Sequence, residues 1–484
     1  MNSISDCPSP TIYDAVAYPT AVFAQTHPSH LAALAQVHGL SPFDVETARV
    51  LEIGCGDGMN LLAMAAAYPR AQFHGFDLAP TVVARGRERA EAAGLTNVRL
   101  DVGDIVDAAG SLEGSFDYVI AHGVYAWVPA QVREALMVLI GRVLAPDGVA
   151  FLSYNALPGG YFRMAVRDLM LHYLEPHADP GEKLRTARNV LEGFVAADAG
   201  GEAVPAAFRH QARATLNQID GLLFHDELSD VYAPQRLADV AAAAAAVGLR
   251  WLGDAGRALL MDGFLPDDIA VEGSEEPQVV RLAQERDLLQ VRFFRRSLLV
   301  RDSAHPDRRF DPSRVAPLWA TALCDRLADG SYRGEGGEEF RIRDPELDAA
   351  FAELAGRRPG RIRVGDLVHD ADHFRGIMQL FDRGSLALHV DSAPFAEALP
   401  ERPCVSGLTR AMLAEGLDTV CTLDHSVIRL EDSVLRRFLA RIDGGQDEAA
   451  LRESAAASGF VDPDQWRAAL DIAVAKALIA PTVA

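Results

Sequence analysis

Three glycines, Gly54, Gly56 and Gly58, follow a short apolar run that contains an acidic residue, Glu52. Because glycine has no Cβ atom, the backbone can turn tightly here and approach a ligand closely, beside the exposed N–H groups of the helix that follows. The spacing is G-x-G-x-G, whereas dinucleotide sites use G-x-G-x-x-G, and the Glu52 carboxylate would repel a pyrophosphate. The loop therefore favours a cationic ligand.

Two further acidic residues each follow an apolar run. Asp77 ends the second run, where a carboxylate can accept hydrogen bonds from both hydroxyls of a ribose, and Leu78 is placed beside it. Asp104 comes after the third run, where its side chain can face an adenine amino group while Ile105 covers the ring. A glycine-rich turn alone would be a plain loop, but together these residues describe a nucleoside bound without phosphate.

The elements that must position these residues form an alternating pattern from residue 48 to residue 154. Short apolar runs predict strands over residues 49–53, 72–76, 98–102, 116–121 and 149–154. Amphipathic stretches between them predict helices over residues 60–68, 80–93 and 131–144, which stop at Pro69, Gly94 and before Pro146. We expect an α/β fold with a doubly wound parallel sheet, and a ligand crevice where the first strand meets the first helix.

The remaining chain divides into segments of different character. We predict an N-terminal lid segment (1–44), the core (45–160), a helical insertion (161–300), a connecting domain of mixed helix and strand (301–400) and a small winged-helix-like domain (401–484). Residues 248–253 and 291–300 have strand composition. They form either the last strands of the core sheet or a separate small domain.

Charge and cysteine usage exclude several classes of protein. The 484 residues include 46 Lys and Arg against 68 Asp and Glu, a net charge of −22, which disfavours a mainly electrostatic grip on nucleic acid or an anionic membrane. The five cysteines are scattered and fit neither a disulfide framework nor a zinc site, so no metal is expected. No apolar run approaches the ~20 residues of a membrane span, and we expect a cytoplasmic protein.

The segment 48–154 resembles the S-adenosylmethionine-dependent methyltransferases of the Rossmann-like class, through its E-x-G-x-G-x-G loop and Asp77. In that family the glycine loop lies against the methionine part of the cofactor, the acid at the position of Asp77 holds the ribose, and the residue at Asp104 meets the adenine. The resemblance implies a methyltransferase with S-adenosylmethionine as cofactor and a seven-stranded sheet.

A narrower resemblance extends over most of the chain. Its motifs are Tyr13-Asp14, Tyr18-Pro19 and the segments 25–28, 122–129, 153–159, 224–228, 292–299 and 423–430. They are similar to bacterial methyltransferases that carry a regulatory domain, some of which methylate lysines of outer-membrane proteins. The resemblance implies a protein acceptor, and it leaves open a small-molecule methyltransferase or a noncatalytic cofactor-binding regulator.

Methyl transfer from a sulfonium is an in-line displacement that needs alignment and exclusion of water more than an enzyme nucleophile. Tyr125, Trp127 and Tyr154 follow strand ends, where they can form an aromatic channel for an acceptor lysine or simply pack in the core. His122 can act as a general base or as a positioning group near the cofactor.

Two other groups of residues are candidates for a role in the site, one in ordering the N-terminal lid and one in binding a metal. His27 is expected to order the N-terminal lid, and Tyr13 and Tyr18 can close over the cofactor in the same way. The segment 224–227 (FHDE) contains three adjacent potential metal ligands, but adjacent residues on a helix cannot point one way, so a polar packing patch is favoured.

Overall fold

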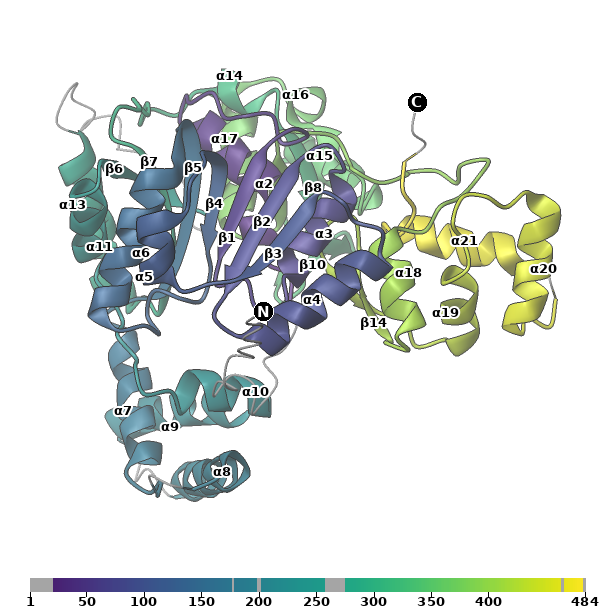
Figure 1. Ribbon diagram of the computed structural model, residues 1–484. Helices are drawn as coiled ribbons and strands as arrows, with labels where there is room; N and C mark the ends of the chain where they lie inside the picture. Colours follow the sequence, from purple (N-terminus) through teal and green to yellow (C-terminus); the bar gives the residue numbers. More distant parts are fainter. Residues whose placement is uncertain (1–20, 176–177, 198–201, 257–274, 463–464, 482–484) are drawn as a thin grey trace, which may run out of the picture.

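A seven-stranded sheet forms the centre of the molecule. The computed structural model describes residues 21–175, 178–197, 202–256, 275–462 and 465–481 (Figure 1). The strand order is β3-β2-β1-β4-β5-β7-β6, in which β1 to β5 run parallel and β7 is antiparallel to both β5 and β6. The strands are β1 (Arg49–Ile53), β2 (Gln72–Asp77), β3 (Val98–Val102), β4 (Phe116–Ala121), β5 (Leu144–Asn155), β6 (Leu249–Asp254) and β7 (Phe294–Arg301).

The predicted fold class is confirmed, and the two late strands belong to the core sheet rather than to a separate domain. Strand β7 begins at Phe294, three residues later than the segment expected from composition. The backbone of Val291 has φ of 51°, which interrupts the extended conformation. The intervening residues therefore form a turn between helix and strand.

Helices cover both faces of the sheet because successive strand residues point to opposite sides. Leu51 packs in one cluster with α6 (Ala130–Val143), α11 (Leu237–Ala245) and α13 (Glu275–Gln290), and Val50 packs in another with α2 (Pro28–Val37) and the connecting domain. The first crossover helices are α3 (Met59–Ala67), α4 (Pro80–Ala92) and α5 (Ile105–Ser111), and a short 3₁₀ turn, η1 (Ala24–Thr26), precedes α2.

A helical arm follows β5 and projects away from the sheet in Figure 1. It consists of α7 (Gly160–Leu171), α8 (Pro180–Ala196), α9 (Ala203–Leu216), α10 (Asp220–Leu222) and the π-helical turn η2 (Leu223–Glu227). A small apolar cluster that includes Val166, Met170, Leu191 and Leu223 holds these helices together. The arm therefore has a core separate from the two clusters of the sheet.

The connecting region contains two three-stranded sheets. Its elements are α14 (Pro312–Val315), β8 (Trp319–Ala322), β9 (Cys324–Arg326), β10 (Tyr332–Gly334), β11 (Glu339–Phe340), α15 (Pro345–Gly356), β12 (Ile362–Arg363), α16 (Val364–Leu367), α17 (Ala371–Asp382) and β13 (Leu386–His389). It packs on the α2 side of the core sheet.

The C-terminal module, defined here as residues 401–481, is built from helices around one short hairpin. Its elements are α18 (Gly407–Ala414), β14 (Thr419–Cys421), β15 (Val427–Arg429), α19 (Ser433–Leu439), α20 (Glu448–Ser458) and α21 (Trp466–Ala475). The predicted winged-helix-like character, helices flanking a short antiparallel pair, is confirmed. The module lies beside α3 and α4 (Figure 1).

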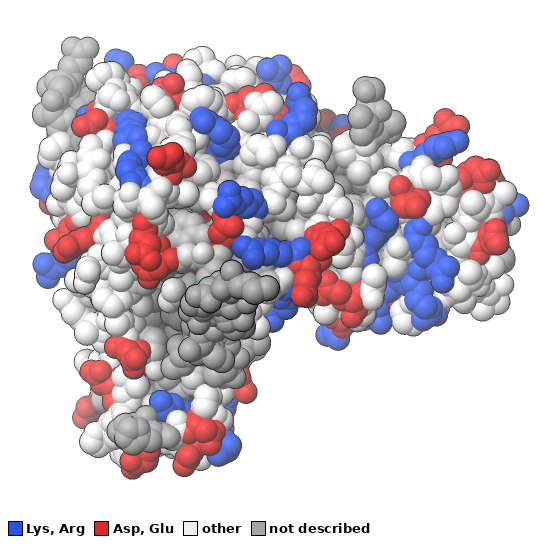
Figure 2. Space-filling view, in the orientation of Figure 1, with Lys and Arg blue, Asp and Glu red and all other residues white. Residues whose placement is uncertain are grey.

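Surface charge is mixed, and acidic and basic side chains are interspersed on the face shown in Figure 2. Across the described ranges, no helix is both long and apolar enough to cross a membrane. Tyr13, Asp14, Tyr18 and Pro19 of the predicted lid lie outside the described residues. The domain limits given above remain predictions.

Candidate functional site

The glycine loop turns with all three glycines in the left-handed region. Their φ values are 73° at Gly54, 57° at Gly56 and 70° at Gly58, a conformation that other residues rarely adopt. A Cβ atom at Gly54 would lie 2.6 Å from Val124, and one at Gly58 would lie 2.7 Å from Leu100. At Gly56 nothing lies within 4 Å, so this glycine faces open space where a ligand can approach the backbone.

Asp77 is tied to the loop by backbone donors. Its Oδ2 accepts a hydrogen bond from the Gly56 N–H at 2.9 Å, and its Oδ1 accepts one from the Ala79 N–H at 3.0 Å. Burial raises the pKa of Asp77, and these backbone hydrogen bonds act in the opposite direction. The carboxylate is thus held at the carboxyl end of β2, where a ribose can meet its remaining lone pairs.

Large apolar side chains are exposed at the ends of β2 and β3. Leu78 is 50% exposed, Val102 44% and Val106 38%. Asp104 lies between them and caps α5, because its Oδ1 accepts a hydrogen bond from the Val106 N–H at 2.7 Å. This arrangement can cover an adenine ring, with Ile105 half-buried alongside. Sequence reasoning missed Val102 and Val106, although both flank the Gly103-Asp104 pair.

Glu52 is a buried carboxylate with one oxygen unsatisfied. Its Oε1 accepts a hydrogen bond from Asn60 Nδ2 at 2.8 Å, while Oε2 has no hydrogen-bond partner among the described residues. Burial raises the pKa of Glu52 to about 8. A cationic group brought to this carboxylate would supply the missing partner and favour its ionised form.

These features fit S-adenosylmethionine. The buried acid Glu52 suits a positive charge on the amino acid part, the open backbone at Gly56 admits close approach, and Asp77 suits the ribose hydroxyls. The exposed apolar group around Asp104 suits the base. The assignment of the individual residues stays a prediction.

His122 lies at the end of β4 under an aromatic ring from the N-terminal segment. Its ring centroid is 3.9 Å from that of Phe23, and its Nδ1 lies 2.9 Å from the hydroxyl of Ser153. Burial lowers the pKa of His122 to about 4, so the ring is neutral at physiological pH. Phe23 was not anticipated, because no local pattern pairs residue 23 with residue 122.

The three aromatic residues proposed for an acceptor channel occupy two different places. Tyr125 and Tyr154 are buried in the core, 6.1 Å apart between ring centroids, and the Tyr154 hydroxyl lies 3.0 Å from that of Ser297. Trp127 instead lies at the contact with the helical arm, where its ring centroid is 4.9 Å from that of Tyr232. Their roles in catalysis stay predictions.

The FHDE segment forms the π-helical turn η2 and pairs with an arginine of α7. Arg163 Nη2 lies 2.7 Å from Glu227 Oε1 and 3.3 Å from Asp226 Oδ2. Glu227 is fully buried, so this pair fixes the turn against α7. The favoured interpretation as a polar packing patch agrees with these contacts.

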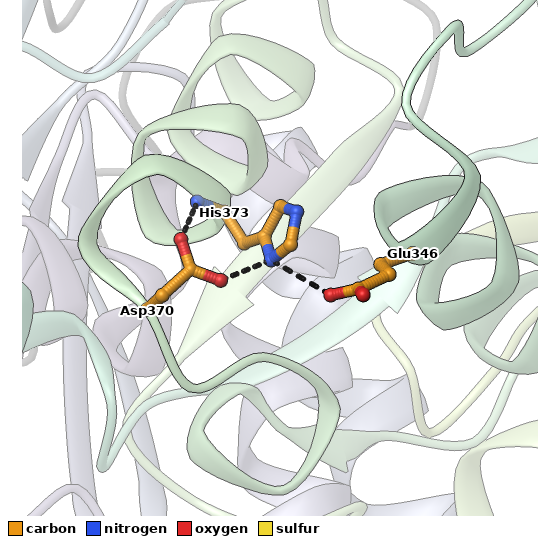
Figure 3. A group of neighbouring side chains, drawn as sticks. All are labelled: Glu346, Asp370 and His373. Carbon is orange, nitrogen blue, oxygen red and sulfur yellow. Dashed lines mark hydrogen bonds and ion pairs between the residues drawn. The ribbon is translucent and has the colours of Figure 1, made fainter.

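One group in the described part of the chain has the spacing of metal ligands: Glu346, Asp370 and His373 (Figure 3). Asp370 accepts hydrogen bonds from two N–H groups of α17 and also contacts His373 Nδ1, while His373 Nε2 lies 3.1 Å from Asp344, which caps α15. The surrounding carboxylates raise the pKa of His373. Helix capping and ion pairing account for the group.

Comparison with known proteins identifies two family models. A methyltransferase domain matches residues 50–148, and a predicted methyltransferase regulatory domain matches residues 220–301. An uncharacterized protein of Rickettsia prowazekii, RP028, is 35% identical over 221 residues, which cover 45% of this chain and 88% of the relative. A second, RP789, is 31% identical over 301 residues, 62% of this chain and 54% of the relative.

The fold matches a solved structure over almost the whole chain. PKMT2 from Rickettsia typhi superposes with a TM-score of 0.79 at 23% identity, over 96% of this chain and 100% of that protein, and it has also been solved in complex with AdoHcy. The chain belongs to the Rossmann-like S-adenosylmethionine-dependent methyltransferases that carry a methyltransferase regulatory domain, and S-adenosylmethionine is its cofactor.

Proposed function

We propose that this methyltransferase N-methylates lysine side chains of a protein acceptor. The name of PKMT2 denotes a protein lysine methyltransferase, and this chain shares its fold from the core through the later domains. The observation that carries the proposal is the fold shared with PKMT2, and it is supported by a pair of aromatic rings after β4, Trp127 and Tyr232, that contact cationic side chains.

That aromatic pair is connected to the glycine loop through Val124. Val124 packs against Gly54, and the Val124 carbonyl accepts a hydrogen bond from the Trp127 N–H at 2.9 Å. Two arginines of α7 already use the aromatic faces there: the guanidinium carbon of Arg163 lies 4.8 Å from the Trp127 ring centroid, and that of Arg167 lies 5.1 Å from the Tyr232 centroid. An acceptor lysine at this rim would gain the same cation–π attraction, worth about 0.5–2 kcal/mol.

The cofactor supplies an electrophilic methyl group on a sulfonium. The protein must then align the acceptor amine with that methyl and exclude water. A lysine ammonium has an ordinary pKa of about 10.4 and must lose its proton before it can attack, which desolvation beside aromatic rings favours.

His122 suits a positioning role better than that of a general base. With its pKa lowered to about 4, it holds a proton poorly near neutral pH. Its contacts with Ser153 and Phe23 instead fix the end of β4 close to the glycine loop.

The test is incubation of the purified protein with methyl-labelled S-adenosylmethionine and fractionated lysate, with Asp77→Ala as the control. We expect acid-stable label in protein that depends on Asp77, and methylated lysine after hydrolysis. Label that appears only in small molecules would overturn the proposal in favour of a metabolite methyltransferase. Cofactor binding without label in any pool would point to a noncatalytic regulator.

A further inference from the structure

The C-terminal module packs directly on the two helices that follow the cofactor loops. Met59, Leu62 and Ala63 of α3 share one apolar cluster with Leu408 and Met412 of α18. The approach to α4 is so close that a Cβ atom on Gly407 would lie 2.3 Å from the Ala93 carbonyl oxygen. Figure 1 shows α18 beside α3 and α4. The module therefore packs against the helices that begin at the cofactor loops.

A buried hydrogen-bond chain crosses this interface. His425 Nε2, in the turn between β14 and β15, lies 2.9 Å from Asn60 Oδ1, and Asn60 Nδ2 donates to Glu52 Oε1 at 2.8 Å. The orientation of the Asn60 amide is settled by a third contact, because the Phe23 backbone N–H donates to the same Oδ1 at 3.0 Å. Since Oδ1 accepts, His425 Nε2 must carry the proton and donate.

The backbone at His425 adopts an uncommon conformation to make this contact. Its φ is 61°, in the left-handed region. The side chain is 4% exposed, and its other nitrogen, Nδ1, has no hydrogen-bond partner within the described residues. The neighbouring titratable ring is His27, at 5.1 Å between centroids. The polar contact of this ring is thus directed at Asn60.

A second, independent link joins the module to the glycine loop. Glu415, which follows α18, accepts hydrogen bonds from Arg89 of α4 at 3.0 and 2.8 Å. Arg89 is buried and also lies 3.4 Å from Asp57 Oδ2, between Gly56 and Gly58. Asp57 in turn accepts from the Met59 N–H and fixes the start of α3.

We propose that His425 and Glu415 of the C-terminal module are positioning residues for S-adenosylmethionine: His425 orients Glu52 through Asn60, and Glu415 orients Asp57 through Arg89. Through these two contacts the module holds acidic residues of the cofactor site in place without touching the cofactor itself. The proposal concerns cofactor binding, so it does not depend on the identity of the methyl acceptor.

The first test compares His425→Ala with His425→Gln in the full-length protein by calorimetric titration with S-adenosylmethionine. Loss of the donor should raise the cofactor Kd about fivefold to tenfold, the effect of one buried hydrogen bond. Glutamine offers an N–H at a similar reach and should restore the Kd to within about twofold. Ser458→Ala, which removes a hydroxyl bonded to Ser454 within α20, is the matched control and should bind as the wild type does.

The pH profile distinguishes positioning from a general loss of stability. Without His425 the Asn60 amide keeps its contacts with the Phe23 N–H and with Thr26 but loses one donor to Oδ1. Its hydrogen bond to Glu52, which lowers the pKa of that carboxyl, is then held less firmly, while the nearby carboxylates Asp57 and Asp77 still raise the pKa. The midpoint of cofactor binding against pH should therefore move upward in His425→Ala and return in His425→Gln. An unchanged midpoint together with an unchanged Kd would overturn the role of His425.

Glu415→Gln tests the second link at a site that tolerates change, because this side chain is 39% exposed. We expect a cofactor Kd about two to five times higher, since the Arg89 guanidinium loses its carboxylate partner and keeps one neutral acceptor oxygen instead of two charged ones. The control is Glu448→Gln, which alters a surface pair with Arg452 in the same module. If neither His425→Ala nor Glu415→Gln changes cofactor affinity, the module does not support the site and the proposal is wrong.

Discussion

Glu52 and Asp77 are both acids of the cofactor site, but their surroundings give them different tasks. Asp77 is half-buried and receives a backbone N–H on each oxygen. Glu52 is buried with one oxygen bonded to Asn60 and the other unpartnered among the described residues, so burial keeps it protonated to about pH 8. Asp77 can accept hydrogen bonds from hydroxyl groups, whereas Glu52 can pair with a positively charged group.

The pKa of Glu52 predicts how the stability of the cofactor-free protein depends on pH. Because its folded-state pKa of about 8 exceeds the value of about 4.3 in an unfolded chain, the folded state retains a proton that the unfolded state has lost. Its contribution to stability is complete below about pH 4.3 and is lost as the pH rises to about 8. Between pH 5 and pH 8 the melting temperature should fall more steeply with rising pH for the wild type than for Glu52→Gln. Parallel curves would contradict this assignment.

Replacement of Asp77 should act on the cofactor directly. We expect Asp77→Ala to weaken S-adenosylmethionine binding by about 1.5–3 kcal/mol, the range for hydrogen bonds to a charged group. Calorimetric titration of the folded variant measures this loss. A wild-type affinity in that variant would show that the ribose is held elsewhere.

At the level of elements, the last two strands of the sheet are joined to α13 by a buried ion group. Arg295 of β7 is fully buried, and its Nε lies 2.8 Å from Asp287 of α13 while its Nη1 lies 3.3 Å from Asp254 of β6. Removing one partner of such a group leaves uncompensated charge in the interior. The edge of the sheet therefore depends on this arginine.

Arg295→Ala should destabilise the protein by about 3–5 kcal/mol, because Asp254 and Asp287 would both lose a buried guanidinium, even though Asp287 keeps its ion pair with Arg292 at 2.6 Å. The free energy of unfolding from denaturant titration measures the loss. The matched control is Arg281→Ala on the exposed side of α13, where the pair with Glu285 is worth no more than about 0.5 kcal/mol. Equal effects of the two substitutions would refute the structural role of the buried group.

At the level of the whole molecule, the sheet meets two large additions on different sides. The C-terminal module contacts α3 and α4, which follow the cofactor loops, and the helical arm contacts Trp127 of the loop after β4 through Arg163 and Arg167 of α7. Because charges of both signs are interspersed on the face seen in Figure 2, overall charge singles out no acceptor there. Recognition of the acceptor is expected at the contact between arm and core.

Trp127→Ala should therefore lower kcat/KM for a protein acceptor. The corresponding loss of transition-state stabilisation should be about 0.5–2 kcal/mol, the range of a cation–π contact. The Kd for S-adenosylmethionine should stay within about twofold of the wild type, because Trp127 lies at the outer end of its loop. Tyr173→Ala, an exposed aromatic of the arm, serves as the control. If the affinity for S-adenosylmethionine falls while kcat/KM for the protein acceptor is unchanged, Trp127 supports cofactor binding and not acceptor binding.

Most of the core could be predicted from residue order. The strands over residues 49–53, 98–102 and 116–121 begin and end where expected, because apolar runs, glycines and prolines act on their own neighbourhood. The left-handed glycine loop and the place of Asp77 at the end of β2 follow from the same local rules.

Other parts of the site depend on contacts that no local pattern encodes. Asn60 and His425 are separated by 365 positions, and Phe23 of the N-terminal segment contacts His122 after β4. Tyr154 lies within β5 and is buried in the core, whereas Trp127 follows β4 and lies at the arm, although the sequence suggested that both follow strand ends. Short-range periodicity specifies each element, whereas hydrogen-bond partners and burial arise only when distant elements pack together.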